Sequence, residues 1–289
     1  MTLARVLSAI VAIILAFGMI VLGGWYFTFC FGIIVYLGLQ EYFNLARATG
    51  LAPAAKTTIA LSLLLLITAT VSPTLVDAVM PIAGTIICFY LLFQSKLATI
   101  ADISSSILGL FYGGYLPSYW VRLRSLGNAE LSNLPLGGYF PLSFPDVDSL
   151  PVGLTITLLA FACIWAADIG AFVVGKLFGR TRLTDISPKK TVEGAVFGVL
   201  GSVAVAAAGS WYLSWTGQPL SGMALGLLIG IASLLGDLTE SMMKRDAGVK
   251  DSGQLIPGHG GILDRTDSYV FIAPLVYYFI ILLLPLLPS

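Results

Sequence analysis

The sequence predicts an all-α fold, a polytopic integral membrane helix bundle with about nine transmembrane helices. Hydrophobic residues make up 57% of the chain and charged residues only 10%, with a mean hydropathy of +0.94. Soluble domains carry charge at about a quarter of their positions, so most of this surface must face something other than water. Runs such as Val6–Leu22 and Val270–Leu287 are continuously apolar over helical lengths. They lack the short apolar and polar alternation of a membrane β-barrel.

Nine apolar runs lie near the ~20 residues that a helix needs to cross a bilayer. In chain order they are residues 6–22, 25–43, 57–76, 80–95, 103–120, 150–175, 192–213, 221–238 and 268–287. Only Gly23 and Gly24 separate the first two runs. The fifth run ends at a stretch rich in Pro, Gly, Ser and Asn, and polar stretches flank the seventh run and precede the ninth.

The polar chemistry concentrates after Trp165, and this predicts three regions. Residues 1–120 are expected to be N-terminal transmembrane helices that serve as scaffold or oligomer contacts, and residues 121–149 an extracytoplasmic loop. Residues 150–289 are expected to form a C-terminal catalytic transmembrane domain, with cytoplasmic loops at 176–193 and 237–267. No repeat of fixed period is visible.

The basic residues predict the orientation of the chain. If the N-terminus is cytoplasmic, 13 of the 15 basic residues fall on the cytoplasmic side, and only Arg122 and Arg124 fall outside. The 13 are Arg5, Arg47, Lys56, Lys96, Lys176, Arg180, Arg182, Lys189, Lys190, Lys244, Arg245, Lys250 and Arg265. So strong a bias favours this layout, because cytoplasmic loops carry an excess of Lys and Arg.

Charge and cysteine content exclude some classes of protein. The formal net charge is zero, so nothing points to nucleic acid as a partner. Cys30, Cys88 and Cys163 lie inside apolar runs without a CxxC neighbour and are interpreted as small core residues. Arg5 precedes the first apolar run, but more runs follow and no small-x-small cleavage site stands out, so the first helix is expected to be retained.

Asp168 is the first candidate functional residue. An aspartate inside an apolar run costs about 2.5–3.5 kcal/mol on insertion scales, so it normally faces a cavity, a partner or an ion. Glycines at 170, 175 and 179 would let other backbone approach that side of the helix. The alternative is a solvated aspartate at a helix end.

The loop 176–193 is a candidate phosphate site. Its five basic residues could simply reflect the orientation of the chain. Ser187-Pro188, however, predicts a helix start, where free N–H groups favour phosphate. Lys189 and Lys190 would lie at that end, where their charge is unfavourable unless an anion is bound.

The stretch Gly236–Asp267 combines carboxylates with basic residues. Asp237 and Glu240 are spaced i, i+3 at the end of one run, and Asp264 and Asp267 repeat that spacing at the start of the next. Two helix ends could therefore converge on one site. Mg²⁺ is usually held by one or two carboxylates together with substrate phosphates, an arrangement typical of phosphoryl or nucleotidyl transfer.

Glycines in this stretch suggest close approach of a phosphate. The segment PGHGG, residues 257–261, would let the backbone pass near a phosphate or pyrophosphate. His259, the single histidine, could contact a ligand, donate a hydrogen bond to phosphate, or pack at a helix start. The alternative for the whole stretch is a salt-bridged juxtamembrane loop.

A motif in this stretch resembles a known family. The run S-x-x-K-R-x4-K-D-x-G-x2-I-P-x-H-G-G-I-x-D-R-T-D, Ser241–Asp267, is similar to the 27-residue signature of phosphatidate cytidylyltransferases, or CDP-diacylglycerol synthases. No position departs from it. The segment SPKKTVEG, Ser187–Gly194, and the surroundings of Asp168 also resemble the family, so the likeness covers about the last 40% of the chain. The first half resembles the family only as a stack of apolar helices.

The resemblance implies a multi-pass enzyme of the cell membrane that joins CTP to phosphatidic acid, giving CDP-diacylglycerol and pyrophosphate. It implies a homodimer and a Mg²⁺-dependent two-cation centre whose second ion could be monovalent. Asp237 and Asp264 would be the principal metal ligands, with Asp168 and Asp267 as supporting carboxylates. The residues that would serve the phosphates or close the pocket are Lys244, Arg245, Lys250, Arg265, Ser187, Lys189, Lys190, His259, Gly260 and Gly261.

Two other functions stay open on the residues alone. An anion transporter also uses intramembrane charge, but here the charges gather at one face and no inverted repeat is apparent. A lipid-kinase-like enzyme would use CTP as a phosphoryl donor, with attack at the terminal phosphate. The products separate the three: pyrophosphate, CDP or none.

Overall fold

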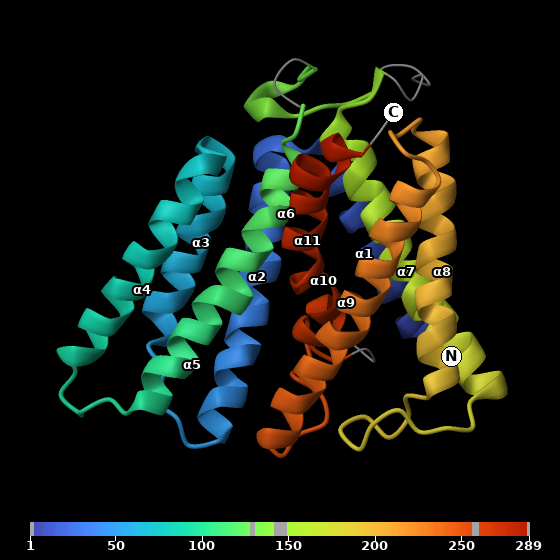
Figure 1. Cartoon of the computed structure of the whole chain (residues 1–289). Helices are drawn as coiled ribbons and strands as arrows, with labels where there is room; N and C mark the ends of the chain where they lie inside the picture. The colour runs from blue at the N-terminus through green and yellow to red at the C-terminus, as the bar shows by residue number, and fades with distance from the viewer. Residues whose placement is uncertain (1–2, 128–130, 142–148, 256–259, 288–289) are drawn as a thin grey trace. The chain divides into compact units, whose positions relative to one another are not determined.

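The computed structural model describes residues 3–127, 131–141, 149–255 and 260–287 (Figure 1). Within these residues the regular elements are helices, and β-pairing is limited to two isolated bridges, Leu134 with Gly138 and Arg182 with Thr191. The all-α class that the sequence predicts is therefore confirmed.

The helices follow the predicted runs in order. Before residue 141 they are α1 (Leu3–Leu22), α2 (Gly24–Ala48), α3 (Ala55–Val71), α4 (Val76–Leu92), α5 (Ile100–Leu110) and α6 (Leu116–Arg124). After it they are α7 (Val152–Phe178), α8 (Val192–Tyr212), α9 (Leu220–Asp246), α10 (Leu263–Val270) and α11 (Ile272–Tyr278). Single turns of 3₁₀-helix lie at Pro73–Leu75, Pro135–Gly137 and Leu284–Leu286, and π-helical turns at Phe111–Tyr115 and Phe279–Leu283.

Six helical segments of the described chain are long and apolar enough to cross a membrane. They are Gly24–Ala48, Pro73–Leu92, Val152–Phe178, Val192–Tyr212, Leu220–Asp246 and Leu263–Leu286. Of the other predicted spans, α3 is only 17 residues long, and a π-helical turn interrupts the run at 103–120. The apolar helices indicate a membrane protein, and the full layout of nine spans stays a proposal.

The chain forms two compact units. The first consists of Met1–Phe140 with Met243–Thr266, and the second of Pro141–Met242 with Asp267–Ser289. The divisions fall inside α9 and α10, so each of these helices contributes residues to both units. The functional division of the chain into residues 1–120, 121–149 and 150–289 stays a prediction.

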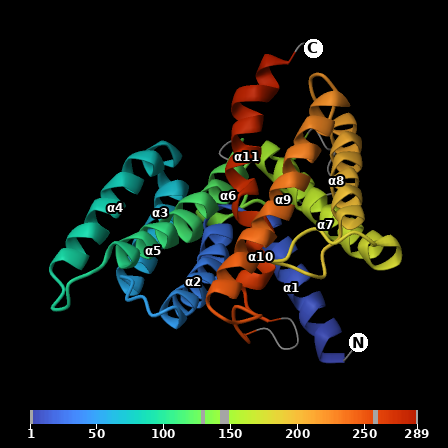
Figure 2. The ribbon, with the colours of Figure 1, turned by 60° about the horizontal axis from the view of Figure 1, so that its bottom comes forward.

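In the first unit α3 and α4 lie side by side, as both views show (Figures 1 and 2). The π-helical turn between α5 and α6 carries Gly113 and Gly114. A Cβ at Gly113 would collide with Leu39 of α2, and one at Gly114 with Ser62 of α3. The absence of side chains at this turn lets it pack directly against two other helices.

The two arginines outside the predicted cytoplasmic set are buried in α6, which continues past the predicted run end at residue 120. The Arg122 guanidinium donates to both carboxylate oxygens of Asp77 on α4, at 3.0 and 3.2 Å. Arg124 donates to the carbonyls of Ile20 and Val21, which end α1. Both arginines therefore have hydrogen-bond acceptors inside the fold, as buried cations require.

In the second unit α7 and α8 pack along each other, and α9 packs against α8 (Figures 1 and 2). A Cβ at Gly198 of α8 would lie 2.7 Å from the Ala167 carbonyl oxygen of α7, and one at Gly226 of α9 would lie 2.6 Å from that of Ser202. Glycines at these contacts bring the helix backbones together, as is typical of helices in membranes.

Candidate functional site

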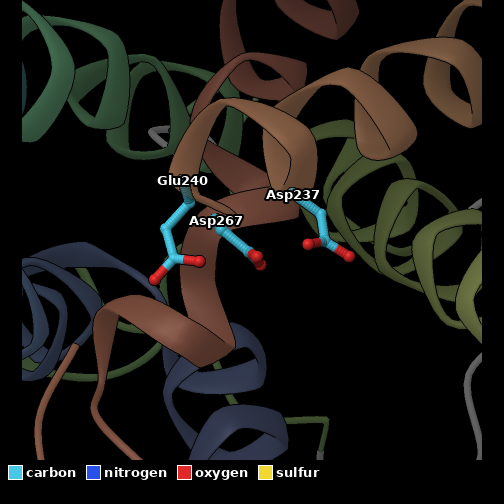
Figure 3. Close-up of side chains that lie close together, drawn as sticks. All are labelled: Asp237, Glu240 and Asp267. Carbon is cyan, nitrogen blue, oxygen red and sulfur yellow. The ribbon is translucent and has the colours of Figure 1, made fainter. Parts of the chain in front are cut away.

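Three carboxylates meet in the second unit. Asp237 and Glu240 lie one turn apart on α9, and Asp267 lies on α10. One oxygen from each lies within 4.8 Å of the other two (Figure 3). Glu240 is 0% exposed and Asp267 8%, whereas Asp237 is partly accessible. Three converging carboxylates suit a hard cation such as Mg²⁺, which prefers oxygen ligands.

The local backbone makes this convergence possible. A Cβ at Gly236 would lie 2.6 Å from the backbone oxygen of Asp267, so glycine lets α9 approach α10 closely at this point. The predicted run ended at residue 238, but α9 continues to Asp246, which is a correction to the sequence-based boundary. The Asp237–Glu240 pair therefore lies within a helix rather than at its end.

Lys190 contributes a basic group beside this cluster. Its Nζ lies 2.5 Å from Asp237 Oδ2, and the Ser241 hydroxyl donates to Asp237 Oδ1 at 3.3 Å. Lys190 belongs to the loop between α7 and α8, so the structure joins two of the segments that the sequence singles out. A partly accessible lysine beside carboxylates can balance the charge of a bound phosphate.

The predicted helix start at Ser187-Pro188 is wrong. Lys190 N–H donates to the Ser187 carbonyl at 3.0 Å, which makes this segment a turn. Helix α8 begins at Val192, where the Thr191 side chain caps Gly194 N–H. The sequence signal misled because proline also suits turns.

The N-terminal turn of α8 already holds an anion from the chain itself. Glu193 accepts hydrogen bonds from the backbone N–H groups of Arg180 and Thr181 at 3.1–3.2 Å and so closes the loop. The phosphate-binding argument from a free helix start therefore does not apply to Lys189 and Lys190. Lys189 is exposed and Ser187 half-buried, and phosphate binding by these residues stays a prediction.

Asp168 lies on the exposed side of α7. Its Oδ1 accepts a hydrogen bond of 3.3 Å from the Ser233 hydroxyl, which lies one turn before Asp237 on α9. In the described residues Asp168 is not a member of the three-carboxylate group. A supporting role for it stays a prediction.

Asp264 belongs to the first unit and is held by protein donors. Its Oδ1 lies 2.6 Å from Lys244 Nζ, and both side chains are buried. Its Oδ2 accepts hydrogen bonds from the backbone N–H and hydroxyl of Ser252 and from Gly261 N–H, at 2.8–3.0 Å. Because the Lys244 ammonium already lies against Oδ1, a metal ion bound there would meet a positive charge unless the Lys244 bond opens. The metal role of Asp264 stays a prediction.

The two described glycines of the predicted phosphate segment approach carboxylates of the chain. A Cβ at Gly260, whose φ is +85°, would lie 2.6 Å from Asp264 Oδ2. A Cβ at Gly261 would collide with the Glu41 carboxylate. The absence of side chains here is explained by this packing, and contact with a phosphate stays a prediction. His259 lies outside the described residues.

Three further basic residues of the signature are exposed. They are Arg245, Lys250 and Arg265. Arg245 donates to the Val249 carbonyl at 3.0 Å, which closes the turn after α9. The other two lie after α9 and in the first turns of α10, where they are accessible to a charged ligand.

Glu41 and Glu240 have no place in the predicted site. The i, i+3 spacing already pairs Glu240 with Asp237, but the resemblance assigns it no role. Glu41 lies on α2 and is buried, and it accepts three hydrogen bonds from the signature segment. Placing a charged side chain in an apolar run is costly for Glu41, near the end of the run 25–43, just as it is for Asp168. The same sequence signal could therefore have identified Glu41 as a candidate.

Comparison with known proteins agrees with the resemblance. The model of the cytidylyltransferase family matches residues 3–283. A phosphatidate cytidylyltransferase of Synechocystis sp. is 66% identical over 98% of each chain. The chloroplastic phosphatidate cytidylyltransferase 4 of Arabidopsis thaliana is 44% identical over 89% of this chain and 68% of that protein.

A more distant relative matches a shorter part. A phosphatidate cytidylyltransferase of Staphylococcus aureus is 42% identical over 125 residues, which are 43% of this chain and 48% of that protein. The family model spans nearly the whole chain, including every described residue of the three-carboxylate group and the signature. The chain therefore belongs to the cytidylyltransferase family.

Proposed function

We propose that the chain transfers a cytidylyl group from CTP to phosphatidic acid, giving CDP-diacylglycerol and pyrophosphate, in phospholipid biosynthesis. The observation that carries this proposal is the convergence of Asp237, Glu240 and Asp267 in a chain of this family, with Asp267 inside the signature segment and the other two just before it. Nucleotidyl transfer brings two polyanions together and requires concentrated positive charge, which such a group can recruit as a metal ion.

Mg²⁺ is the proposed cofactor. Asp237, Glu240 and Asp267 offer only oxygen donors, and Mg²⁺ is usually bound by one or two carboxylates with substrate phosphates. When bound, the cation would supply positive charge beside the phosphates. The roles that the resemblance gives to Asp264 as a principal ligand and to Asp168 as a supporting carboxylate stay predictions, as does a second ion, which could be monovalent.

The transfer itself requires little acid–base chemistry. An ionised phosphate oxygen of phosphatidic acid attacks the α-phosphorus of CTP. A new P–O bond forms, the bond to the oxygen bridging the α- and β-phosphorus breaks, and its electron pair leaves on pyrophosphate. Because the attacking oxygen is already ionised near neutral pH, a strong general base is unnecessary.

Basic side chains are proposed to hold the two substrates. Lys190 is already beside Asp237, and Lys250 and Arg265 are exposed. Ammonium and guanidinium groups form strong hydrogen bonds to phosphate and offset the charge that accumulates during transfer. Lys244 could join them only by leaving Asp264.

The membrane location follows from the chemistry of the substrates. Phosphatidic acid resides in the bilayer, and CTP arrives from the cytoplasm. A multi-pass protein of the cell membrane, with its N-terminus and polar loops on the cytoplasmic side, would meet both. The bias of basic residues supports this orientation. A homodimer is part of the same proposal.

Purified protein in detergent tests the proposal. The reaction contains phosphatidic acid, CTP labelled at the α-phosphate and Mg²⁺, with and without EDTA. We expect label in a lipid product and release of pyrophosphate, both abolished by EDTA. At a limiting Mg²⁺ concentration Asp237→Asn should form much less of both products, whereas Asp185→Asn should form them at the parent level because that side chain is 96% exposed in a loop.

The products also test the alternatives. Release of CDP without labelled lipid would favour a lipid kinase. If the folded protein forms neither product, the result would favour an anion transporter.

A further inference from the structure

We propose that Glu41 is a positioning residue for the reaction, which clamps the signature segment so that Asp264 and Lys244 keep their geometry. This inference rests on the proposed function. It concerns a glutamate of α2, outside the signature and outside the three-carboxylate group. All the contacts that support it lie within the first compact unit.

Glu41 uses both carboxylate oxygens to hold two separate parts of the segment. Oε1 accepts a hydrogen bond from Ile262 N–H at 3.0 Å, and Oε2 accepts one from Leu263 N–H at 2.9 Å. Oε2 also accepts from the Ser252 hydroxyl at 2.9 Å. One side chain therefore ties Ser252 to the start of α10.

The partners of Glu41 are also the partners of Asp264. Ser252 donates its backbone N–H to Asp264 Oδ2 at 3.0 Å. Its hydroxyl oxygen also lies 3.0 Å from that atom, so its one proton is shared between Asp264 and Glu41. Asp264 is one residue past Leu263, and its other oxygen holds Lys244. Glu41 thus acts on the Asp264–Lys244 pair through Ser252 and through the first amides of α10.

The sequence of the segment leaves room for this carboxylate. A Cβ at Gly253 or Gly261 would collide with the Glu41 side chain. Because these two residues lack a Cβ atom, the backbone of the segment can lie against the Glu41 carboxylate. Its 8% exposure means that these hydrogen bonds have little competition from water, which strengthens them.

A glutamine variant removes the clamp with little change of shape. The N–H groups of Ile262 and Leu263 can only donate and bond different oxygens of Glu41, so the glutamine NH₂ would face one of them and lose that bond. We expect kcat of Glu41→Gln to fall between about tenfold and a hundredfold, the range for loss of an orienting partner. The KM for CTP should change less than about twofold, because Glu41 brings no positive charge to the substrate.

Asp102 provides the matched control. It is another buried carboxylate of the first unit, and it accepts from Ala52 N–H and from Thr99, which caps α5. Both of these partners lie outside the signature. Asp102→Asn should lower thermal stability but leave kcat per folded molecule unchanged.

Hydrogen exchange tests the clamp without reference to activity. One of the amides of Ile262 and Leu263 should exchange about tenfold faster in Glu41→Gln than in the parent protein, and both should exchange at parent rates in Asp102→Asn. If exchange is faster in Glu41→Gln but the parent protein makes no CDP-diacylglycerol, the clamp is retained and the proposed function is refuted. The two failures are therefore distinguishable.

The inference is overturned if Glu41→Gln keeps the parent kcat, or if its activity falls only in proportion to the folded fraction, as in the control. It is also overturned if the two amides exchange at parent rates. Should Glu41→Gln fail to fold, Ser252→Ala removes the bridge between Glu41 and Asp264 alone. That variant should lower kcat several-fold, and an unchanged kcat would refute the clamp.

Discussion

Replacing Lys244 by methionine should destabilise the protein far more than breaking an exposed ion pair. Lys244 and Asp264 are 11% and 8% exposed, and their charged atoms lie 2.6 Å apart. Methionine retains most of the aliphatic side chain but removes the ammonium group. Asp264 would then be left as a buried carboxylate without its cation.

The magnitude follows from burial. Removing one partner of a buried ion pair costs about 3–5 kcal/mol, and the lower end applies here because Ser252 and Gly261 still donate to Asp264. The pair of Arg182 and Asp185 is the matched control, with a similar length of 3.1 Å but 52% and 96% exposure. Arg182→Gln should cost no more than about 1 kcal/mol.

Equilibrium unfolding in mixed detergent, followed by circular dichroism, measures both variants. A difference of at least about 2 kcal/mol between Lys244→Met and Arg182→Gln is expected. Adding Asp264→Asn to Lys244→Met should recover part of the loss, because the remaining buried group is then neutral. If the two single variants unfold alike, the Lys244–Asp264 pair is not buried as described, and the reasoning fails.

Three further variants test the candidate site. Asp237→Asn should raise the Mg²⁺ concentration needed for half-maximal activity by about tenfold or more, because a carboxylate ligand is lost. An Mg²⁺ titration of activity measures this, with Asp185→Asn as the control. Identical titrations of the two variants would remove Asp237 from the metal site. Lys250→Ala should lower kcat or raise the KM for CTP or phosphatidic acid while leaving the free energy of unfolding nearly unchanged, since its side chain is exposed. Unchanged kcat and KM for both substrates would count against a role in substrate binding. Gly236→Ala should destabilise the protein by about 1–3 kcal/mol and raise the Mg²⁺ concentration needed for half-maximal activity, because its Cβ would collide with the Asp267 backbone. An unfolding curve and an Mg²⁺ titration like those of the parent protein would contradict that close approach.

The apolar helices were predictable because their signal is local. Each predicted run corresponds to helix, since continuous apolar residues of that length can satisfy their backbone in a membrane only as helices. Helix ends were less predictable. The predicted start of the run at 192 agrees with α8, but α9 runs on through Asp246 because polar residues can also be helical. Ser187-Pro188 forms a turn and no helix start, because proline also suits turns.

The candidate site was predictable in part. The spacing of Asp237 with Glu240 was visible, and Asp267 was already a candidate ligand. The engagement of Asp264 by Lys244 was not visible, because lysines near aspartates in a sequence can face either the partner or the solvent. The packing of Gly260 and Gly261 against carboxylates of the chain was not visible either, and the approach of a phosphate to these glycines stays a prediction.

The amino-acid sequence by itself determined the membrane class, the order of the helices and the concentration of charge in the last part of the chain. These properties depend on composition and on spacing along one helix. The tertiary structure alone decided which carboxylates meet, because Asp267 reaches α9 and Glu41 reaches Ile262, 221 positions away, only through packing. Burial then determined their roles, since a carboxylate removed from water must find donors or cations among whatever groups the fold places beside it.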